Sequence, residues 1–287
     1  MFNKRHIVRT IAATASILAL SFTAACGSGQ STASNSTDSD DITQQTYKPG
    51  KLTIATGQPS YEPWVMNDKP ESGEGYEAAV AYAVADKLGF KKSDVVWTRT
   101  AFDTAIAPGA KDWDFNIQQF GITDERKKAV DFSSSYYNDS QSVVVKKDSK
   151  FANATKVSDL KDATVGVMVG TLAYDYAKAN IKDDIQTFND DAALAQALDA
   201  GQIDALVTST VECVYMVQSE QVKDAKVLGR LPDSEDKSGM GIVLPKDSKL
   251  TAAVTKAVDD LNADCTIKKL QDKWLAEYTT DLTELKK

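Results

Sequence analysis

Histidine is nearly absent from this sequence. The 287 residues include a single histidine, His6, which lies in an amino-terminal stretch with the features of a cleaved secretory signal. The rest of the chain therefore cannot form a Ser-His-Asp or Cys-His nucleophile or a histidine-ligated zinc site. The commonest general base at neutral pH is also missing, although carboxylates remain. We expect no catalytic residue, no metal site and no cofactor.

Cysteine is almost as rare, since Cys26, Cys213 and Cys265 are the only examples. Cys26 directly follows the signal region. Cys213 and Cys265 would be free to form a disulfide in an oxidising compartment. The sequence alone leaves open whether they pair.

Long apolar runs are missing as well. The longest, Ile11–Ala25, follows a basic start and has about 15 residues, fewer than the ~20 that span a bilayer. We therefore predict a signal peptide over residues 1–25. The run Thr-Ala-Ala-Cys that ends at Cys26 resembles a lipoprotein processing site, so we expect lipid on this cysteine. The alternative is ordinary cleavage after alanine, which would release a free secreted protein.

The next stretch lacks apolar side chains almost entirely. Residues 27–47 are mainly Ser, Thr, Gly, Asn, Gln and Asp, a composition too poor in burial to fold. We predict that residues 26–47 form a lipidated flexible tether, which would hold a folded body close to a membrane.

Basic residues are fewer than acidic residues in this sequence. The chain has 33 lysines and arginines against 41 aspartates and glutamates, a net charge of −8, and removal of the signal leaves 30 against 41. Nucleic acid is therefore not an expected partner. The acidic balance excludes no small ligand, because a buried cationic group can coexist with a negative surface.

Strand and helix patterns alternate along the remaining ~240 residues, a length that suits two modest lobes. This alternation predicts mainly parallel sheets covered by helices on both faces. The predicted strands are 51–56, 95–97, 114–118, 142–145, 164–169, 203–207 and 241–244, and the predicted helices are 75–88, 172–180, 190–200, 250–262 and 266–275.

The stretch Asp114–Tyr137 carries the densest set of signals. Thr123 stands at an N-cap position with two acidic residues after it, which predicts a helix start. Arg126 and two lysines follow near the positive end of that helix, where cations are disfavoured. A guanidinium in this place can hold a carboxylate by two parallel hydrogen bonds. The alternative is a solvated basic patch.

This stretch resembles the signature of the solute-binding proteins of amino-acid ABC importers (family 3). Thr123, Glu125 and Arg126 match in place, as do Val-Asp-Phe-Ser at 130–133 and the tyrosines at 136–137. Gly121 departs from the family, which usually has Thr or Ser there to help hold the ligand. The resemblance covers about residues 51–275. It implies an α/β, two-lobed type II periplasmic-binding-protein fold, in which each lobe is a mainly parallel sheet flanked by helices.

The family layout also implies domain boundaries and two hinge crossings. It assigns residues 51–135 and 241–287 to lobe 1, 141–235 to lobe 2, and 136–140 and 236–240 to the hinge. Cys213 and Cys265 then fall in different lobes, where a disulfide would oppose hinge motion, so we expect two separate small buried residues. Cys265 also replaces a family glycine, which predicts mild strain in that turn.

By the same resemblance, four stretches converge in a cleft between the lobes. Aromatic rings would flank the ligand, with sealing of the lobe surface as the alternative for Trp64 and Phe102. One of two adjacent glutamines would face the cleft, and the turn at Gly170 would open a helix whose free amides seat an anion opposite Arg126. The expected ligand-binding residues are Tyr61, Trp64, Phe102, Gln118, Gln119, Gly121, Thr123, Arg126, Met168, Thr171, Leu172, Ser209 and Glu212.

Ser209 is the largest departure from the family. Members that bind amino acids commonly have an aspartate there, which pairs with the α-ammonium. Glu212, one turn along the predicted helix, is a candidate substitute, and a structural or exposed glutamate is the alternative. Met168 stands where some relatives have a polar residue that reads the ligand side chain. The ligand is thus expected to be a free amino acid first, then a small peptide or another carboxylate.

The resemblance implies a non-enzymatic receptor outside the cytoplasm, anchored to the cell membrane through Cys26. It would capture a polar amino acid or related small carboxylate and deliver it to an ABC permease with its ATPase. These partners would be separate chains, because the sequence has no P-loop and no membrane span. The alternatives are a dehydratase or lyase on the same fold, or a ligand sensor subunit. We expect a monomer.

Overall fold

The computed structural model describes residues 41–279 and 282–287. The predicted signal peptide, Cys26 and most of the predicted tether lie outside these residues. The last part of the predicted tether is folded, since Ile42–Gln44 forms a 3-10 turn and Thr46 is buried. The Tyr47 amide donates to Asp114 Oδ1 at 2.5 Å. The prediction that unfolded chain extends to residue 47 is therefore wrong for residues 41–47.

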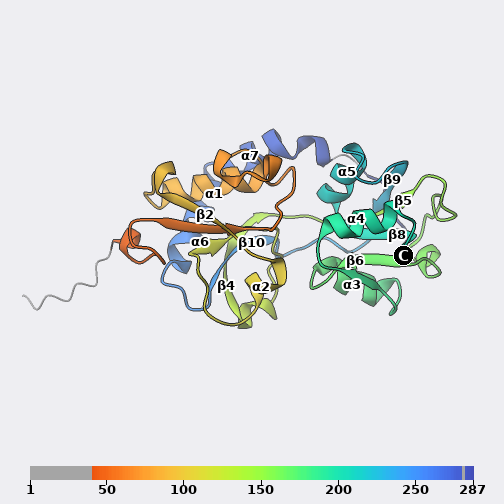
Figure 1. Ribbon diagram of the computed structural model, residues 1–287, viewed down its shortest axis with the longest axis horizontal. Coiled ribbons are helices and arrows are strands. Elements are labelled where there is room, and N and C mark those ends of the chain that lie inside the picture. Colours follow the sequence, from red (N-terminus) through yellow and green to blue (C-terminus); the bar gives the residue numbers. More distant parts are fainter. Residues whose placement is uncertain (1–40, 280–281) are drawn as a thin grey trace, which may run out of the picture. The chain divides into compact units, whose positions relative to one another are not determined.

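The first sheet has five strands in the order β2-β1-β3-β10-β4 (Figure 1). The strands are β1 (Leu52–Thr56), β2 (Val95–Arg99), β3 (Phe115–Asn116), β4 (Val130–Tyr137) and β10 (Met240–Pro245). Strands β1, β2 and β3 pair in parallel, and β10 runs antiparallel to both β3 and β4. The sheet is mainly parallel because only β10 enters it from the other lobe.

Helices α1 (Tyr76–Lys87), α2 (Phe102–Ile106), α6 (Thr251–Ala263) and α7 (Thr266–Trp274) belong to the first lobe. Val80 and Val84 of α1 and Val254 and Val258 of α6 are fully buried, because the 3.6-residue period places them on one face of each helix. They pack in one core with Leu52 and other residues of the sheet.

The second sheet has the order β7-β6-β8-β5-β9. Its strands are β5 (Gln141–Lys146), β6 (Val165–Met168), β7 (Gln186–Phe188), β8 (Ala205–Ser209) and β9 (Ala225–Arg230), and its helices are α3 (Leu172–Asn180), α4 (Asp191–Asp199) and α5 (Thr210–Gln218). Strand β5 runs antiparallel to β8 and β9. Val143 and Val145 pack in one core and Val144 in another, because successive strand residues face opposite sides of the sheet.

Short 3-10 turns connect several of these elements. Beyond Ile42–Gln44 they are Met66–Asp68, Pro70–Ser72, Lys92–Asp94, Arg126–Lys128, Val157–Leu160 and Ala276–Tyr278. The predicted helix start after Thr123 is only such a turn. The predicted hinge at 136–140 also begins too early, since Tyr136 and Tyr137 still belong to β4 and Tyr137 pairs with Met240. The serines of β4 obscured this strand because they break the alternation of apolar and polar residues.

The chain connects the two sheets between β4 and β5 and again between β9 and β10. A further connection exists at the carboxyl end, where Glu284 bridges to Arg230 and Lys286 bridges to Lys156. Leu285 is buried in a core of the second lobe, which gives this return an apolar anchor. The assignment of all of 241–287 to lobe 1, with two crossings, is therefore wrong for the last residues.

Both remaining cysteines are free thiols. Cys213 is buried as expected, but Cys265 is exposed, contrary to the prediction of burial. Cys265 has φ 62° and ψ 16°, the left-handed conformation, at the turn between α6 and α7. A residue with a Cβ is disfavoured there by roughly 1–2 kcal/mol. The strain predicted from the missing glycine is therefore present in the backbone.

Replacement of Cys265 by glycine should stabilise the protein. Relief of the left-handed strain exceeds the added entropy of an unfolded glycine, so we expect a gain of about 1 kcal/mol and a rise in Tm of about 2–4 °C. Thermal unfolding followed by circular dichroism measures this change. The matched control is C265S, which removes the thiol but keeps the strain and should leave Tm unchanged. An equal rise in both variants would contradict this account.

Candidate functional site

A cavity of about 70 Å³ lies between residues of the two lobes. Segments from both sheets and from both connections between them contribute to its walls. Its lining residues are Phe102, Gln119, Gly121, Arg126, Asp139, Gln141, Met168, Thr171, Leu172, Ala173, Asp191, Thr208, Ser209, Glu212, Asp236 and Met240.

Arg126 is held at this cavity by contacts on both lobes. Its Nη1 donates to the Gly121 carbonyl at 2.6 Å, and its Nη2 donates to the Gly170 carbonyl of the second lobe at 2.8 Å. The guanidinium carbon lies 5.5 Å from the centre of the Phe102 ring, a cation–π distance. Phe102 in turn stacks on Phe120 at 4.6 Å. Burial lowers the pKa of Arg126, although the guanidinium remains charged.

The turn before Arg126 sets its position. The Arg126 amide donates to Thr123 Oγ1 at 3.1 Å, so the predicted capping hydrogen bond exists. Gly121 allows a close approach of the lobes, because a Cβ on it would lie 2.5 Å from Leu172 Cδ1 and 2.8 Å from Asp236 Oδ2. A side chain at this position would therefore require the ends of the Leu172 and Asp236 side chains to move.

A buried carboxylate holds Gln119 at the cavity wall. The Gln119 backbone, at φ 50°, donates its amide to Glu77 Oε1 at 2.7 Å, and its side-chain Nε2 bonds to Glu77 Oε2. The Tyr136 hydroxyl also bonds to this carboxylate. Burial raises the pKa of Glu77 to about 7, against the effect of these donors. Gln119 faces the cavity, whereas Gln118 does not line it.

Three carboxylates come from the second lobe and the first connection. Glu212 lies in α5, Asp191 begins α4, and Asp139 lies between β4 and β5. Thr208 Oγ1 donates to Glu212 Oε2 at 2.8 Å and lies 3.5 Å from Asp191 Oδ1. We define Asp139, Asp191 and Glu212 as the acidic cluster.

Burial raises the pKa of every member of the acidic cluster, and for Asp139 the value reaches about 7. The negative charge of Glu212 raises the pKa values of Asp139 and Asp191 further, which places the three groups within electrostatic range of one another. A fourth carboxylate, Asp236, lies near Arg126 on the second connection, and burial raises its pKa too.

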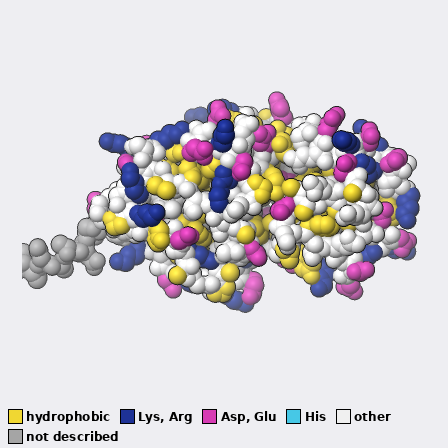
Figure 2. Space-filling model, in the orientation of Figure 1, with side chains coloured by type: hydrophobic (Ala, Val, Ile, Leu, Met, Phe, Trp, Pro, Cys, Tyr) yellow, Lys and Arg dark blue, Asp and Glu magenta, His cyan; other side chains and the backbone are white. Residues whose placement is uncertain are grey.

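The acidic cluster lies inside the protein. On the face shown in Figure 2, basic and acidic side chains are intermixed. The cavity therefore differs from this face, because acidic side chains outnumber basic ones among its lining residues.

The helix starts place these carboxylates. Ser209 caps α5 by accepting from the Glu212 amide at 3.3 Å, and Asp190 caps α4 by accepting from the Ala193 amide at 2.8 Å. Ser209 therefore has a structural role where the family commonly has an aspartate. Glu212 is buried and lines the cavity, so the alternative of an exposed glutamate is wrong.

Most of the predicted ligand-binding residues meet at this cavity. The predicted residues that line it are Phe102, Gln119, Gly121, Arg126, Met168, Thr171, Leu172, Ser209 and Glu212. Trp64 does not, because it has 0% exposure and packs in the first core at 5.5 Å from Tyr137. The prediction that its ring flanks a ligand is therefore wrong. Gln118 and Thr123 are not among the residues that line the cavity.

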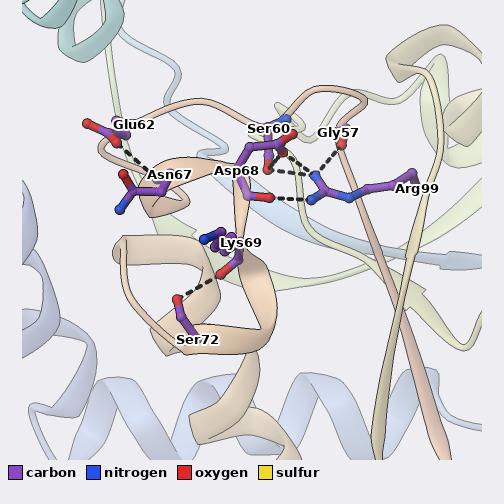
Figure 3. Close-up of polar contacts among 8 residues, drawn as sticks. All are labelled: Gly57, Ser60, Glu62, Asn67, Asp68, Lys69, Ser72 and Arg99. Carbon is purple, nitrogen blue, oxygen red and sulfur yellow. Dashed lines mark hydrogen bonds and ion pairs between the residues drawn. The ribbon is translucent and has the colours of Figure 1, made fainter.

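Tyr61 contacts the second lobe without lining the cavity. Its hydroxyl lies 3.4 Å from the Ala192 amide at the start of α4. The loop that carries it is fixed by Arg99, which donates to the Gly57 carbonyl, to Ser60 Oγ and to Asp68 Oδ1 at 2.9, 2.8 and 2.5 Å (Figure 3). Glu62 of the same loop accepts from Tyr215 of α5 at 3.3 Å.

Sequence reasoning missed Asp139, Asp191 and Asp236. Asp191 follows another aspartate at a predicted helix start, where an acidic residue normally signals capping. Asp139 and Asp236 fall inside the predicted hinge segments. The local sequence therefore accounts for each of these three aspartates without a cavity. No spacing in the sequence indicates that they share a cavity with Glu212.

Comparison with known proteins agrees with this architecture. Residues 52–277 match the family model of bacterial extracellular solute-binding proteins, family 3. The L-cystine-binding protein TcyJ of Escherichia coli strain K12 is 29% identical, over 77% of this chain and 81% of its own length. The L-arginine-binding protein of Pseudomonas aeruginosa is 28% identical, over 80% of this chain and 88% of its own.

Solved structures show the same similarity. An ancestral arginine-binding protein bound to arginine has a TM-score of 0.67 and 30% identity, covering 79% of this chain and 98% of its own. An ancestral amino-acid-binding protein described as a precursor of cyclohexadienyl dehydratase has a TM-score of 0.65 and 30% identity, covering 78% and 95%. The fold is thus that of the two-lobed type II periplasmic binding proteins, as predicted. The chain belongs to the bacterial extracellular solute-binding proteins of family 3.

The raised pKa values predict a pH-dependent stability. Folded Asp139 and Glu77 hold a proton up to about pH 7, whereas the unfolded chain releases it near the ordinary pKa values of 3.8 and 4.5. The contribution of these groups to the free energy of unfolding is therefore full below about pH 4 and is lost as the pH rises to 7. The slope approaches about 1.4 kcal/mol per pH unit for each group.

D139N should flatten this slope by removing the charged form. Urea unfolding of both proteins at pH 5, 6, 7 and 8 measures the difference. D183N, which changes an exposed aspartate of the same lobe, is the matched control and should follow the wild type. Parallel profiles for D139N and wild type would show that Asp139 is already ionised in the folded state.

Proposed function

We propose that this protein is the receptor of an ABC importer and that its cavity binds an amino acid. One observation carries the proposal. A half-buried guanidinium on one lobe and a buried acidic cluster on the other side line the same cavity. This arrangement complements an ion with a carboxylate at one end and an ammonium at the other.

The α-carboxylate would bind at Arg126. In the structure the two terminal nitrogens of Arg126 bond to main-chain carbonyls, and the start of α3 faces the same space. Thr171 caps α3 by accepting from the Tyr174 amide at 3.2 Å, which leaves the first amides of the helix to bind an anion. A carboxylate placed here would contact both lobes.

Contact with both lobes couples binding to closure. Ligand bonds to Arg126 and to α3 exist together only when the lobes approach, so ligand favours the closed arrangement. The cavity is small in this structure, whereas ligand sites commonly measure about 300–1,000 Å³. Its walls belong to different lobes, so movement about the connections would widen it for entry.

The α-ammonium would bind at the acidic cluster. Ser209 supplies no carboxylate, but Glu212 faces the cavity from the next turn of α5. Gln119 adds a polar group from the opposite lobe, held in place by Glu77. Glu212 thus takes the role that the family commonly gives to an aspartate at the position of Ser209.

The remaining parts of the transport function rest on family membership. The protein would act outside the cytoplasm as a monomer, with lipid on Cys26 as its membrane anchor, and would deliver its ligand to a separate permease and ATPase. In the part of the chain that the structure describes, no helix is long and apolar enough to cross a membrane.

Dehydration of a bound acid is the second candidate. A solved neighbour is described as a precursor of a dehydratase, and Glu212, whose pKa burial raises, shares the cavity with Arg126. An acid with a raised pKa can donate a proton at neutral pH. We propose binding without catalysis. Loss of water from a prephenate-like acid, abolished in E212Q, would favour the second candidate instead.

A thermal-shift screen tests the proposal directly. The wild-type protein is heated with each proteinogenic amino acid, with short peptides and with simple carboxylates. A ligand at about 100 times its Kd should stabilise the protein by roughly 2.7 kcal/mol. No shift with any free amino acid would overturn the proposal.

R126A should weaken the binding of whichever amino acid the screen identifies by about 2–5 kcal/mol, because truncation of one partner leaves a carboxylate unpaired in a buried site. Isothermal titration calorimetry measures the loss. K128A removes a neighbouring exposed cation and serves as the control, with affinity close to wild type. Wild-type affinity in R126A would remove this residue from the site.

A further inference from the structure

The charges that line the cavity do not balance. Among the described lining residues, Arg126 is the one cationic side chain, and Asp139, Asp191, Glu212 and Asp236 are acidic. Asp236 interacts electrostatically with Arg126, which assigns it to that end of the cavity. The acidic cluster therefore faces the rest of the space with no protein cation beside it.

One member of the acidic cluster has an unsatisfied oxygen. Asp139 is 7% exposed, and its Oδ1 accepts from the Ser140 amide at 2.7 Å. Its Oδ2 is buried and makes no hydrogen bond of good geometry among the described residues, and the same is true of Asp236 Oδ2. The Val211 amide and the Ser209 hydroxyl lie near the Asp139 carboxylate and lower its pKa. A buried carboxylate oxygen without a well-placed donor is destabilising. This atom is therefore placed to accept from a bound molecule.

A single ammonium does not account for the whole cluster. Glu212 and Asp191 are linked through Thr208, so one ammonium beside Thr208 can serve both. Asp139 comes from a different segment, and Thr208 does not link it to the other two carboxylates. A cationic group beside Asp139 would stabilise its ionised form. The cluster thus has carboxylates for a second cationic group.

The cavity also has apolar lining residues. Phe102, Met168, Leu172 and Met240 line the cavity along with the charged residues. Methylene groups of a long side chain would pack on such walls while the charged tip reaches the carboxylates. Met168 has an apolar side chain, which fits an aliphatic stem.

We infer that the ligand has one carboxylate and two cationic groups, as basic amino acids do. The inference rests on the proposed function, because it takes Arg126 as the carboxylate site. It excludes amino acids with neutral side chains, which leave Asp139 unpaired. It also excludes cystine, whose second carboxylate would meet the acidic cluster, although a 29% identical relative is named for cystine binding.

Paired ligands test the charge without changing the shape. Isothermal titration calorimetry compares L-arginine with L-citrulline, its neutral isostere, and L-lysine with L-norleucine; L-cystine and agmatine complete the panel. We expect each cationic amino acid to bind about 10- to 100-fold more tightly than its neutral counterpart, the range for a hydrogen bond to a charged group. Agmatine, which lacks the carboxylate, should bind weakly, and cystine should not bind.

Two variants locate the second cation. D139N should lower the affinity for arginine about 10-fold or more and leave that for citrulline unchanged, so the ratio between them falls. E212Q should weaken both ligands, because both have the α-ammonium. D183N is the matched control, with wild-type ratios. Citrulline binding that persists in D139N also shows that the variant is folded.

The outcomes separate the two proposals. If citrulline, norleucine or cystine binds as tightly as arginine, and R126A abolishes that binding, the charge inference is overturned and the receptor function stands. An unchanged ratio in D139N likewise overturns the role of Asp139. If no amino acid binds the wild-type protein, both proposals are overturned.

Discussion

The hydrogen bond from Arg126 Nη2 to the Gly170 carbonyl is the contact between the lobes on which the site depends. The two terminal nitrogens of Arg126 bond to carbonyls of Gly121 and Gly170, which belong to different lobes. The contact requires close approach, and Gly121 permits it because any side chain there would meet Leu172 and Asp236. One residue without a Cβ and one guanidinium thus define how the two walls meet.

Charge is the second constraint. Four carboxylates line a small buried space with one guanidinium, and burial raises the pKa of each of them. Proteins rarely bury unpaired acids, because desolvation penalises the charged form. A cationic ligand would offset that desolvation penalty. The carboxylates, which destabilise the ligand-free site, would therefore favour ligand binding. Under the proposed function, the ligand-free protein would be less stable than the ligand-bound protein for this reason.

Contacts outside the cavity limit how the lobes move. The loop fixed by Asp68 and Arg99 carries Tyr61 to the start of α4 and Glu62 to Tyr215 of α5. The carboxyl end returns to the second sheet and buries Leu285 there. These contacts join the lobes at places distant in sequence from Arg126. The contacts between the lobes are thus divided among the cavity, the loop and the carboxyl end.

The sequence determined the order of elements, because periodicity is local: helix α3 has the predicted bounds, and most strands fall within a residue or two of theirs. The Arg126 motif likewise signalled the family. Tertiary structure decided the rest. Trp64 lies in the core and Ser209 caps α5. Asp139, Asp191 and Asp236 line one cavity with Glu212. Their proximity arises from packing between segments far apart in the chain, which no local pattern encodes.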